Sequence, residues 1–145
     1  MIDLNSFDKT KFTNTPYVKR VEKPWGYELH WVPEDCPYMG KIFHLNAGQR
    51  MSLQIHDQKR ENWVLISGRA KVVWDDPNGN LIETEMVKEK GYECQLGQRH
   101  RLCGITDCVI IEVSTPEMGT TLRLEDDYKR PDETPEQRKK ERGEI

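Results

Sequence analysis

Hydrophobic and polar residues alternate along most of the chain between residues 23 and 116. An alternation with a period of two is typical of β-strands that bury one face, because successive side chains point to opposite sides of a sheet. The alternating segments are short and are separated by turn-forming residues. We therefore expect strands within 23–33, 40–48, 50–56, 61–76, 81–87, 92–96, 99–105 and 107–116.

Glycine and asparagine mark the turns between these segments. Gly68 interrupts the long alternating run 61–76, which indicates a bend or bulge there. The sequence DPNGN at 76–80 predicts a hairpin loop, since Asn-Gly adopts positive φ at little cost. Many short strands with little helix are typical of an all-β sandwich or barrel. A chain of 145 residues suits one such domain.

The two ends of the chain lack this pattern, which predicts three parts. Residues 1–20 form a polar arm that we expect to pack on the domain or on a neighbouring subunit. The β domain occupies 21–125, although its alternation fades from about residue 119. The remainder, 126–145, is charged and contains proline, so we expect a solvated tail or a short surface helix without chemistry.

Composition narrows the class of protein. The net charge of −3 argues against a nucleic-acid binder, which usually has a basic face. No apolar run is long enough to span a bilayer, and the N-terminus lacks the apolar stretch of a signal peptide. We expect a cytoplasmic protein without membrane or nucleic-acid partners. The four cysteines form no C-x-x-C pair, so we interpret them as reduced structural or incidental thiols.

Three polar side chains occur where a strand pair should be apolar. Alternation places Ser52, Gln54 and His56 on one face, and after a short turn Glu61 begins the next strand. A hairpin would thus bring Gln54, His56 and Glu61 together. This arrangement is typical of a metal site, but a polar hairpin end on the surface would have the same pattern.

A second histidine favours the metal site. His100 follows a glycine turn, where a later strand could return to the hairpin. Two histidines, one glutamate and one amide oxygen form a mixed nitrogen and oxygen set. Such a set suits one divalent ion among Zn²⁺, Mn²⁺, Co²⁺, Ni²⁺ and Fe²⁺.

The spacing of these residues resembles two motifs of the cupin superfamily. Gly48 to Gly68 reads G-x5-Q-x-H-x4-E-x6-G, with glutamine where the first histidine of the cupin motif usually stands. LGQRH, which ends at His100, resembles the second motif, with Gln95 in place of its proline. Blocks in the right order over roughly 20–130, such as VEKPWGYELHW and LRLEDDYKR, resemble the type II mannose-6-phosphate isomerase domain, which is also found C-terminal to mannose-1-phosphate guanylyltransferases.

This resemblance implies a fold, a ligand set and an activity. The fold would be the cupin double-stranded β-helix, a jelly-roll barrel, assembled as a homodimer. The family's metal ligands would correspond to Gln54, His56, Glu61 and His100. The chain differs from the family in the intervening loop, where Asp57, Gln58, Lys59 and Asn62 replace the usual His, His, Arg and His.

Further residues are candidates for binding and catalysis. Alternation places Lys41 on the inward face, where it could bind an anion or assist proton transfer, unless it reaches water at the strand end. Arg101 matches an arginine of the family and is our second catalytic candidate, although alternation directs it away from His100 and favours a structural salt bridge. The candidates for contacts with the substrate are Lys59, Arg60, Ser52 and Tyr38.

Three functions are compatible with these residues. The first is a metal-dependent sugar-phosphate isomerase that resembles mannose-6-phosphate isomerase and interconverts an aldose and a ketose through an enediolate. The second is a non-catalytic or regulatory sugar-binding cupin. The third is another metal-dependent cupin enzyme, such as a sugar epimerase. The fold alone does not separate these hypotheses, since cupins have many activities.

Overall fold

The structure is a computed structural model that describes residues 1–145. Apart from one α-helix and two short 3₁₀ turns, its regular elements are β-strands, which confirms the all-β prediction. The strands are β1 (Lys19–Lys23), β2 (Gly26–His30), β3 (Met39–Leu45), β4 (Leu53–His56), β5 (Glu61–Ser67), β6 (Ala70–Asp75), β7 (Leu81–Glu85), β8 (Gly91–Cys94), β9 (His100–Gly104), β10 (Cys108–Ser114) and β11 (Thr121–Glu125), and the helix is α1 (Pro135–Glu141).

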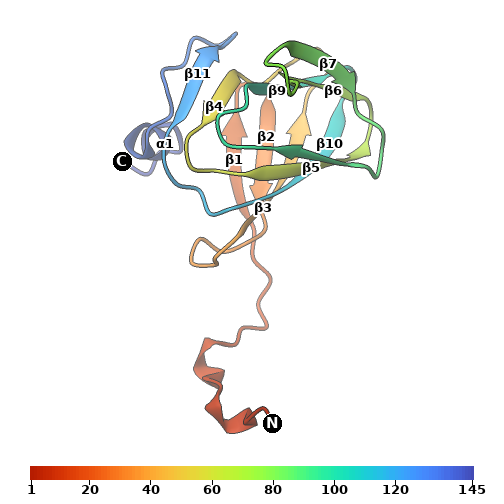
Figure 1. Ribbon diagram of the computed structural model, residues 1–145. Helices are drawn as coiled ribbons and strands as arrows, with labels where there is room; N and C mark the ends of the chain where they lie inside the picture. The colour runs from red at the N-terminus through yellow and green to blue at the C-terminus, as the bar shows by residue number, and fades with distance from the viewer.

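The strands form two antiparallel sheets that face each other (Figure 1). The six-stranded sheet has the order β1-β2-β3-β10-β5-β8, and the five-stranded sheet has the order β11-β4-β9-β6-β7. Some strands that are consecutive in the chain, such as β4 and β5, belong to different sheets. The connection between them therefore crosses the end of the sandwich, and the result is the double-sheet jelly roll expected from the sequence.

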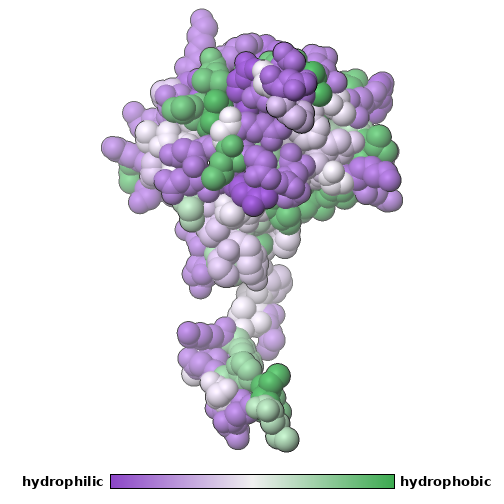
Figure 2. Space-filling view, viewed as in Figure 1, coloured by the Kyte–Doolittle hydropathy of each residue, from purple (hydrophilic) through white to green (hydrophobic).

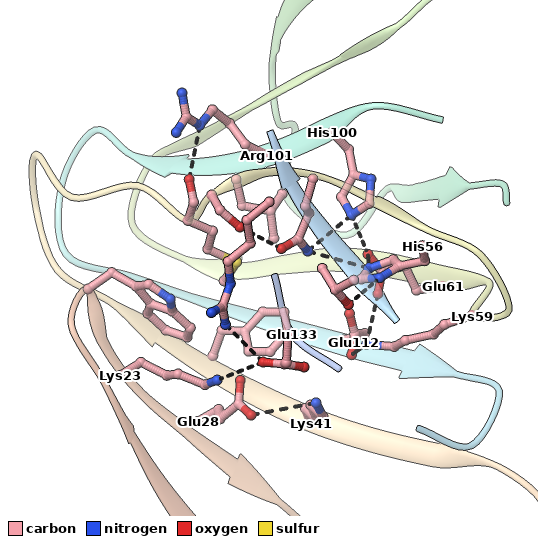
Figure 3. A pocket seen from close by; sticks show the side chains of 18 of the residues that line it. Lys23, Glu28, Lys41, His56, Lys59, Glu61, His100, Arg101, Glu112 and Glu133 are labelled. Atoms are coloured by element: carbon pink, nitrogen blue, oxygen red, sulfur yellow. Dashed lines mark hydrogen bonds and ion pairs between the residues drawn. The ribbon is translucent and has the colours of Figure 1, made fainter. Parts of the chain in front are cut away.

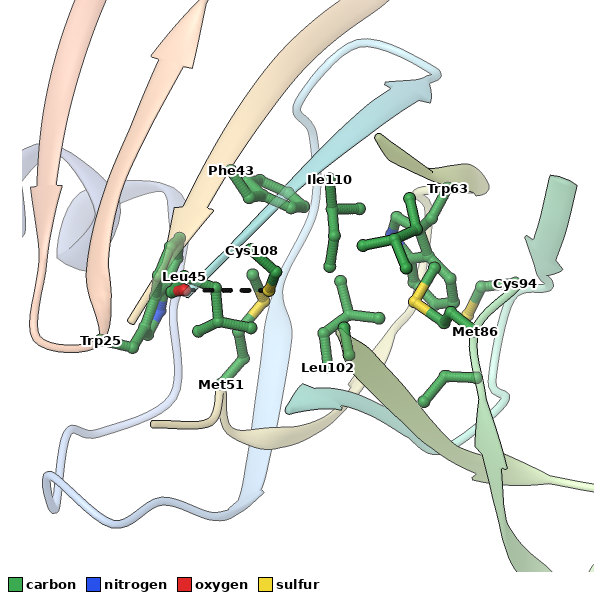
Figure 4. Packing of buried hydrophobic residues seen from close by; sticks show 13 residues of the cluster. Trp25, Phe43, Leu45, Met51, Trp63, Met86, Cys94, Leu102, Cys108 and Ile110 are labelled. Atoms are coloured by element: carbon green, nitrogen blue, oxygen red, sulfur yellow. Dashed lines mark hydrogen bonds between the residues drawn. The ribbon is translucent and has the colours of Figure 1, made fainter. Parts of the chain in front are cut away.

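Apolar side chains fill most of the space between the sheets (Figure 4). Trp63, Leu65 and Ile110 come from the six-stranded sheet, and Val72 and Leu102 come from the other. All five are at most 2% exposed. Trp63 and Leu65 are two residues apart in β5, so they point to the same face of that strand.

The pairing of β3 with β10 introduces charges into this interior. The register sets Lys41 opposite Glu112 and Phe43 opposite Ile110, so all four side chains point between the sheets. Lys41 is 4% exposed and Glu112 is 2% exposed. The predicted inward orientation of Lys41 is confirmed, and the interior divides into an apolar part and a polar part along the same two strands.

The glycine break at Gly68 is also confirmed. Gly68 has φ +77° and separates β5 from β6, which lie in different sheets. A Cβ atom at this position would lie 2.1 Å from the carbonyl oxygen of Asp107. Because both the positive φ and the close backbone approach exclude a side chain, glycine is required for the chain to pass from one sheet to the other.

The N-terminal arm does not pack on its own domain. Residues 1–18 extend away from the sandwich with two short 3₁₀ turns, Leu4–Ser6 and Lys9–Lys11 (Figure 1). The prediction that the arm packs on the domain is therefore wrong for this chain, and packing on a neighbouring subunit stays a prediction. Strand β1 begins at Lys19, within the range 1–20 that we assigned to the arm.

The C-terminal segment folds back on the domain and contains two features that the sequence did not reveal. Strand β11 pairs with β4, although its sequence TLRLE alternates too briefly to predict a strand. Thr121 and Glu133 then exchange backbone hydrogen bonds of 2.9 and 2.8 Å, which hold the following segment beside β11. Helix α1 agrees with the predicted short surface helix, but the side chains around it have roles that are described below.

The four cysteines are free thiols, and three of them are buried, as expected for structural residues. None of the helices has the length and hydrophobicity that crossing a membrane would require.

Truncation of a core side chain in β10 tests the packing between the sheets. Ile110→Ala should lower the free energy of unfolding by about 2–5 kcal/mol, because it removes buried methyl groups and leaves a cavity. Val113→Ala in the same strand is the matched control, since Val113 is 50% exposed, and it should cost about 0.5 kcal/mol or less. Denaturant unfolding measures both, and equal losses for the two variants would contradict this account of the core.

Candidate metal centre

Three ionisable side chains from three strands meet at one end of the sandwich (Figure 3). His56 ends β4, Glu61 begins β5 and His100 begins β9. The carboxylate atom Oε1 of Glu61 lies 3.0 Å from Nε2 of His100 and 3.4 Å from Nε2 of His56. All three side chains are buried, and their ligand atoms lie within 4.8 Å of one another. The predicted convergence of these residues is confirmed.

The neighbours of both histidines orient the rings for metal binding. Nδ1 of His56 lies 2.9 Å from Oγ1 of Thr121, and Nδ1 of His100 lies 2.8 Å from the carbonyl oxygen of Gln98. When Nδ1 carries the proton and donates to these oxygens, Nε2 keeps its lone pair and faces Glu61. A hydrogen bond from the distal ring nitrogen is the usual arrangement around a metal-binding histidine.

Gln54 completes the group. Strand pairing sets Gln54 opposite His100, and its Nε2 lies 3.4 Å from Nε2 of His56 and 3.3 Å from Nε2 of His100. Its Oε1 accepts a hydrogen bond of 2.7 Å from Oγ of Ser52. A half-turn of the amide would direct the oxygen toward the histidines and leave Nε2 to donate to Ser52. Ser52 thus orients Gln54 from behind and does not face the ligand atoms.

Charged side chains beside the candidate metal ligands form ion pairs with one another. Burial opposes the ionised form of Glu61, but the Lys59 ammonium, whose Nζ is 3.0 Å from Oε2, holds the pKa of Glu61 well below its usual range. Lys59 also lies 3.2 Å from Oε2 of Glu112. Burial and the neighbouring Glu61 raise the pKa of Glu112 to about 8. Lys59 therefore faces the site as predicted, but two carboxylates hold it there.

The two histidines differ in their protonation. Burial lowers the pKa of His56. Burial also disfavours the charged form of His100, but hydrogen bonds with Cys94 and Glu61 outweigh it and raise the pKa to about 10. A divalent cation bound here would take the place of the His100 proton, because metals bind the neutral ring. Two imidazoles, one carboxylate and one amide, all inside the protein, fit one divalent ion.

Lys41 lies in a second polar group of the same cavity. Its Nζ lies 3.5 Å from Glu28 and forms a closer ion pair with Glu117. Burial opposes its charge, yet these carboxylates raise the pKa of Lys41, so the side chain is an ammonium. His30 bonds Glu28 at 2.8 Å in this group. Because Lys41 and Arg142 both pair with Glu28 and Glu117, the group is an ion-pair network.

Three other predicted site residues lie away from the ligand atoms. Arg101 donates to the carbonyl oxygens of Met51 and Glu125 and pairs with the Glu125 carboxylate, as the salt-bridge alternative anticipated, although it still lines the cavity. Arg60 is exposed and pairs with Glu93 on the surface. Tyr38 is 58% exposed and lines a separate surface hollow. Arg60 and Tyr38 therefore do not line this cavity.

The sequence analysis missed several residues that line the cavity. Glu112 lies on the inward face of β10, two residues from Ile110, so the alternation of 107–116 could have revealed it. No local pattern predicted the contribution of the residues beyond β10, of which we had assigned 126–145 no chemistry. The cavity contains about 70 Å³ of free space, and its charged lining from beyond β10 consists of Glu117, Arg123, Arg130, Glu133, Arg138 and Arg142.

A comparison with known protein families identifies the family of this chain. The family model described as "Mannose-6-phosphate isomerase C-terminal" matches residues 11–133. The chain belongs to this family. Its fold is accordingly a cupin fold, in agreement with the resemblance of the two motifs.

Curated relatives are much longer than this chain. The alginate biosynthesis protein AlgA of Pseudomonas aeruginosa is 32% identical over 118 residues, which cover 76% of this chain and 23% of AlgA. Mannose-1-phosphate guanylyltransferase 2 of Escherichia coli O157:H7 is 27% identical over 125 residues, which cover 81% of this chain and 25% of that protein. The chain thus spans about a quarter of the length of these relatives.

Solved structures support the fold. The oxalate decarboxylase of Lactobacillus farciminis superposes with a TM-score of 0.62 at 17% identity, over 75% of this chain and 35% of that one. Identity this low indicates a shared architecture and carries no information about the reaction.

Removal of either histidine should abolish metal binding. His56→Ala and His100→Ala should each lose bound Zn²⁺ or Mn²⁺, because each removes one of the convergent Nε2 atoms. Elemental analysis after dialysis measures the loss. His44→Ala is the matched control, since His44 stacks on Tyr27 outside the cavity. Full metal content in both cavity variants would contradict the site.

Proposed function

We propose that this domain is a metal-dependent aldose–ketose isomerase that acts on a sugar phosphate of the mannose 6-phosphate type. The observation that carries the proposal is the set of buried His56, Glu61 and His100 with the partly buried Gln54, which lines the same cavity as the charged Lys41. Membership in the mannose-6-phosphate isomerase family supports the class of reaction.

The reaction requires a proton to move between adjacent carbons while negative charge develops on the sugar oxygens. A divalent ion held by the four residues would polarise those oxygens. Lys41 is suited to donate a proton or a hydrogen bond, because Glu117 and Glu28 keep it charged. A charged ammonium cannot act as the base, so its role would be to stabilise the developing oxyanion.

The cavity walls favour such chemistry because they hold the charged groups in place. Lys59 is fixed between Glu61 and Glu112, and Nε1 of Trp63 donates to Oε1 of Glu112 at 3.3 Å. Charges fixed in advance need little reorganisation when the substrate changes.

A sugar-binding cupin without turnover is the second candidate, and the loop after β4 favours it. Asp57, which replaces a family histidine, accepts a hydrogen bond of 2.8 Å from the backbone of Thr120. The side chain therefore holds the loop beside Gly119 and does not enter the cavity. An aldose–ketose assay separates the two candidates, since a binding module would bind the sugar phosphate without converting it.

The isomerase proposal predicts a rate that depends on Lys41. Metal-loaded protein should convert mannose 6-phosphate to fructose 6-phosphate, and Lys41→Met should lower the rate roughly 100-fold or more. The fold should survive, because Glu117 keeps its pairing with Arg142 and Glu28 keeps His30.

Lys71→Met controls for the loss of a lysine, since Lys71 pairs with Glu83 on the outer side of β6. Absence of conversion by the metal-loaded parent, with binding of the sugar phosphate retained, would favour the binding module.

We also propose that the domain forms a homodimer through its N-terminal arm. Ile2, Leu4, Phe7 and Phe12 are each more than half exposed on an arm that extends from the domain (Figure 2). Strand β1 leaves one edge of the six-stranded sheet unpaired. A second copy could cover both features by exchanging arms, which is a common route to symmetric dimers.

Light scattering at micromolar concentration should give twice the mass of one chain. Deletion of residues 1–17 should give a folded monomer, because these residues are exposed and the first strand of the domain begins at Lys19. A monomeric mass for the full chain would refute the proposed dimer.

A further inference from the structure

Three cationic side chains meet around the carboxylate of Glu133. Arg123 Nη2 lies 2.9 Å from Oε2, Arg138 Nε lies 2.9 Å from Oε1, and Lys23 Nζ lies 3.8 Å from Oε2. They come from β11, α1 and the end of β1, so distant parts of the chain converge here. Figure 3 shows Glu133 directed toward Lys23, on the other side of the drawn cavity from His56 and His100.

These cationic side chains have more hydrogen-bond donors than the Glu133 carboxylate can accept. Arg123 also pairs with Glu141 at 2.6 Å, so three cations face two carboxylates. Its side chain is only 3% exposed, yet its Nε has no hydrogen-bond partner. Arg142, which is 7% exposed and lines the same cavity, likewise has an unpartnered Nε. A phosphate has more acceptor sites than a carboxylate and could satisfy such donors.

The small free volume of the cavity indicates that the Glu133 side chain occupies the space in which a ligand would bind. The free volume of about 70 Å³ is far below the ~300 Å³ at the lower end of small-molecule sites. A sugar phosphate therefore requires a side chain to leave the cavity. Glu133 can do so without disturbing the fold, because its backbone is anchored to Thr121 while its side chain is 12% exposed and lies next to solvent.

We infer that Lys23, Arg123 and Arg138 form an anion subsite in which the Glu133 carboxylate takes the place of the phosphate monoester of the ligand. The identity of the sugar rests on the proposed function, whereas the subsite itself rests on this geometry. Arg138 lies beyond residue 133, where the family match ends, so this cation is supplied by a segment that the family model does not include.

Neutralisation of Glu133 tests the inference. Glu133→Gln keeps the shape of the side chain but removes the competing charge. It should therefore bind inorganic phosphate and mannose 6-phosphate about tenfold more tightly than the parent in calorimetry at fixed ionic strength. Arg138→Gln should bind both about tenfold more weakly. Glu22→Gln is the control, since Glu22 is exposed on β1 and pairs with Arg20, and it should leave both affinities unchanged.

Unchanged phosphate affinity in both Glu133→Gln and Arg138→Gln would overturn the subsite. A gain for galacturonate without a gain for phosphate would overturn the assignment to a phosphate monoester. If the affinities shift as expected but the metal-loaded protein converts no sugar phosphate, the proposed isomerase fails and the subsite stands. Should Glu133→Gln not fold, the phosphate-dependent rise in Tm of the parent must shrink in Arg138→Gln, and an equal rise in both proteins would refute the inference.

Discussion

The polar half of the interior depends on one constraint, which is that a buried charge needs a partner. Glu61 is a buried carboxylate, and Lys59 keeps it ionised while Glu112 in turn binds Lys59. The same requirement links Lys41 to Glu117 and Glu28. Each member of these pairs also contacts a further partner, as Glu117 contacts Arg142. The ion pairs thus fix the positions of the side chains around the metal centre.

This constraint explains how a small sandwich holds both a core and a site. The residues of β3 and β10 alternate in the same way throughout, but Phe43 and Ile110 pack in the apolar part whereas Lys41 and Glu112 lie in the polar part. The apolar cluster supplies the stability that a cavity lined by charges does not. The C-terminal segment then covers the polar part and adds its own ion pairs, among them that of Arg142 with Glu117.

Membership in the mannose-6-phosphate isomerase family and the geometry of the centre support each other. The family relationship motivates the proposed reaction, and His56, Glu61 and His100 are the buried side chains that could hold a metal ion for it. The loop after β4 differs from the family residue by residue, and its Asp57 is used for structure. The anion subsite that we infer consequently uses Arg123 and Arg138, which come later in the chain.

Local alternation and motif spacing predicted the all-β class, the break at Gly68, the inward orientation of Lys41 and the convergence of Gln54 with His56, Glu61 and His100. These predictions succeeded because each follows from the period of two within a strand or from the spacing of a motif. The tertiary structure alone decided which cations reach the cavity. Arg60 pairs with Glu93 outside it, while Arg123 and Arg138, for which the alternation predicted no inward position, line it. Contacts between parts that are distant in sequence depend on how β11 pairs with β4, and local periodicity does not encode that pairing.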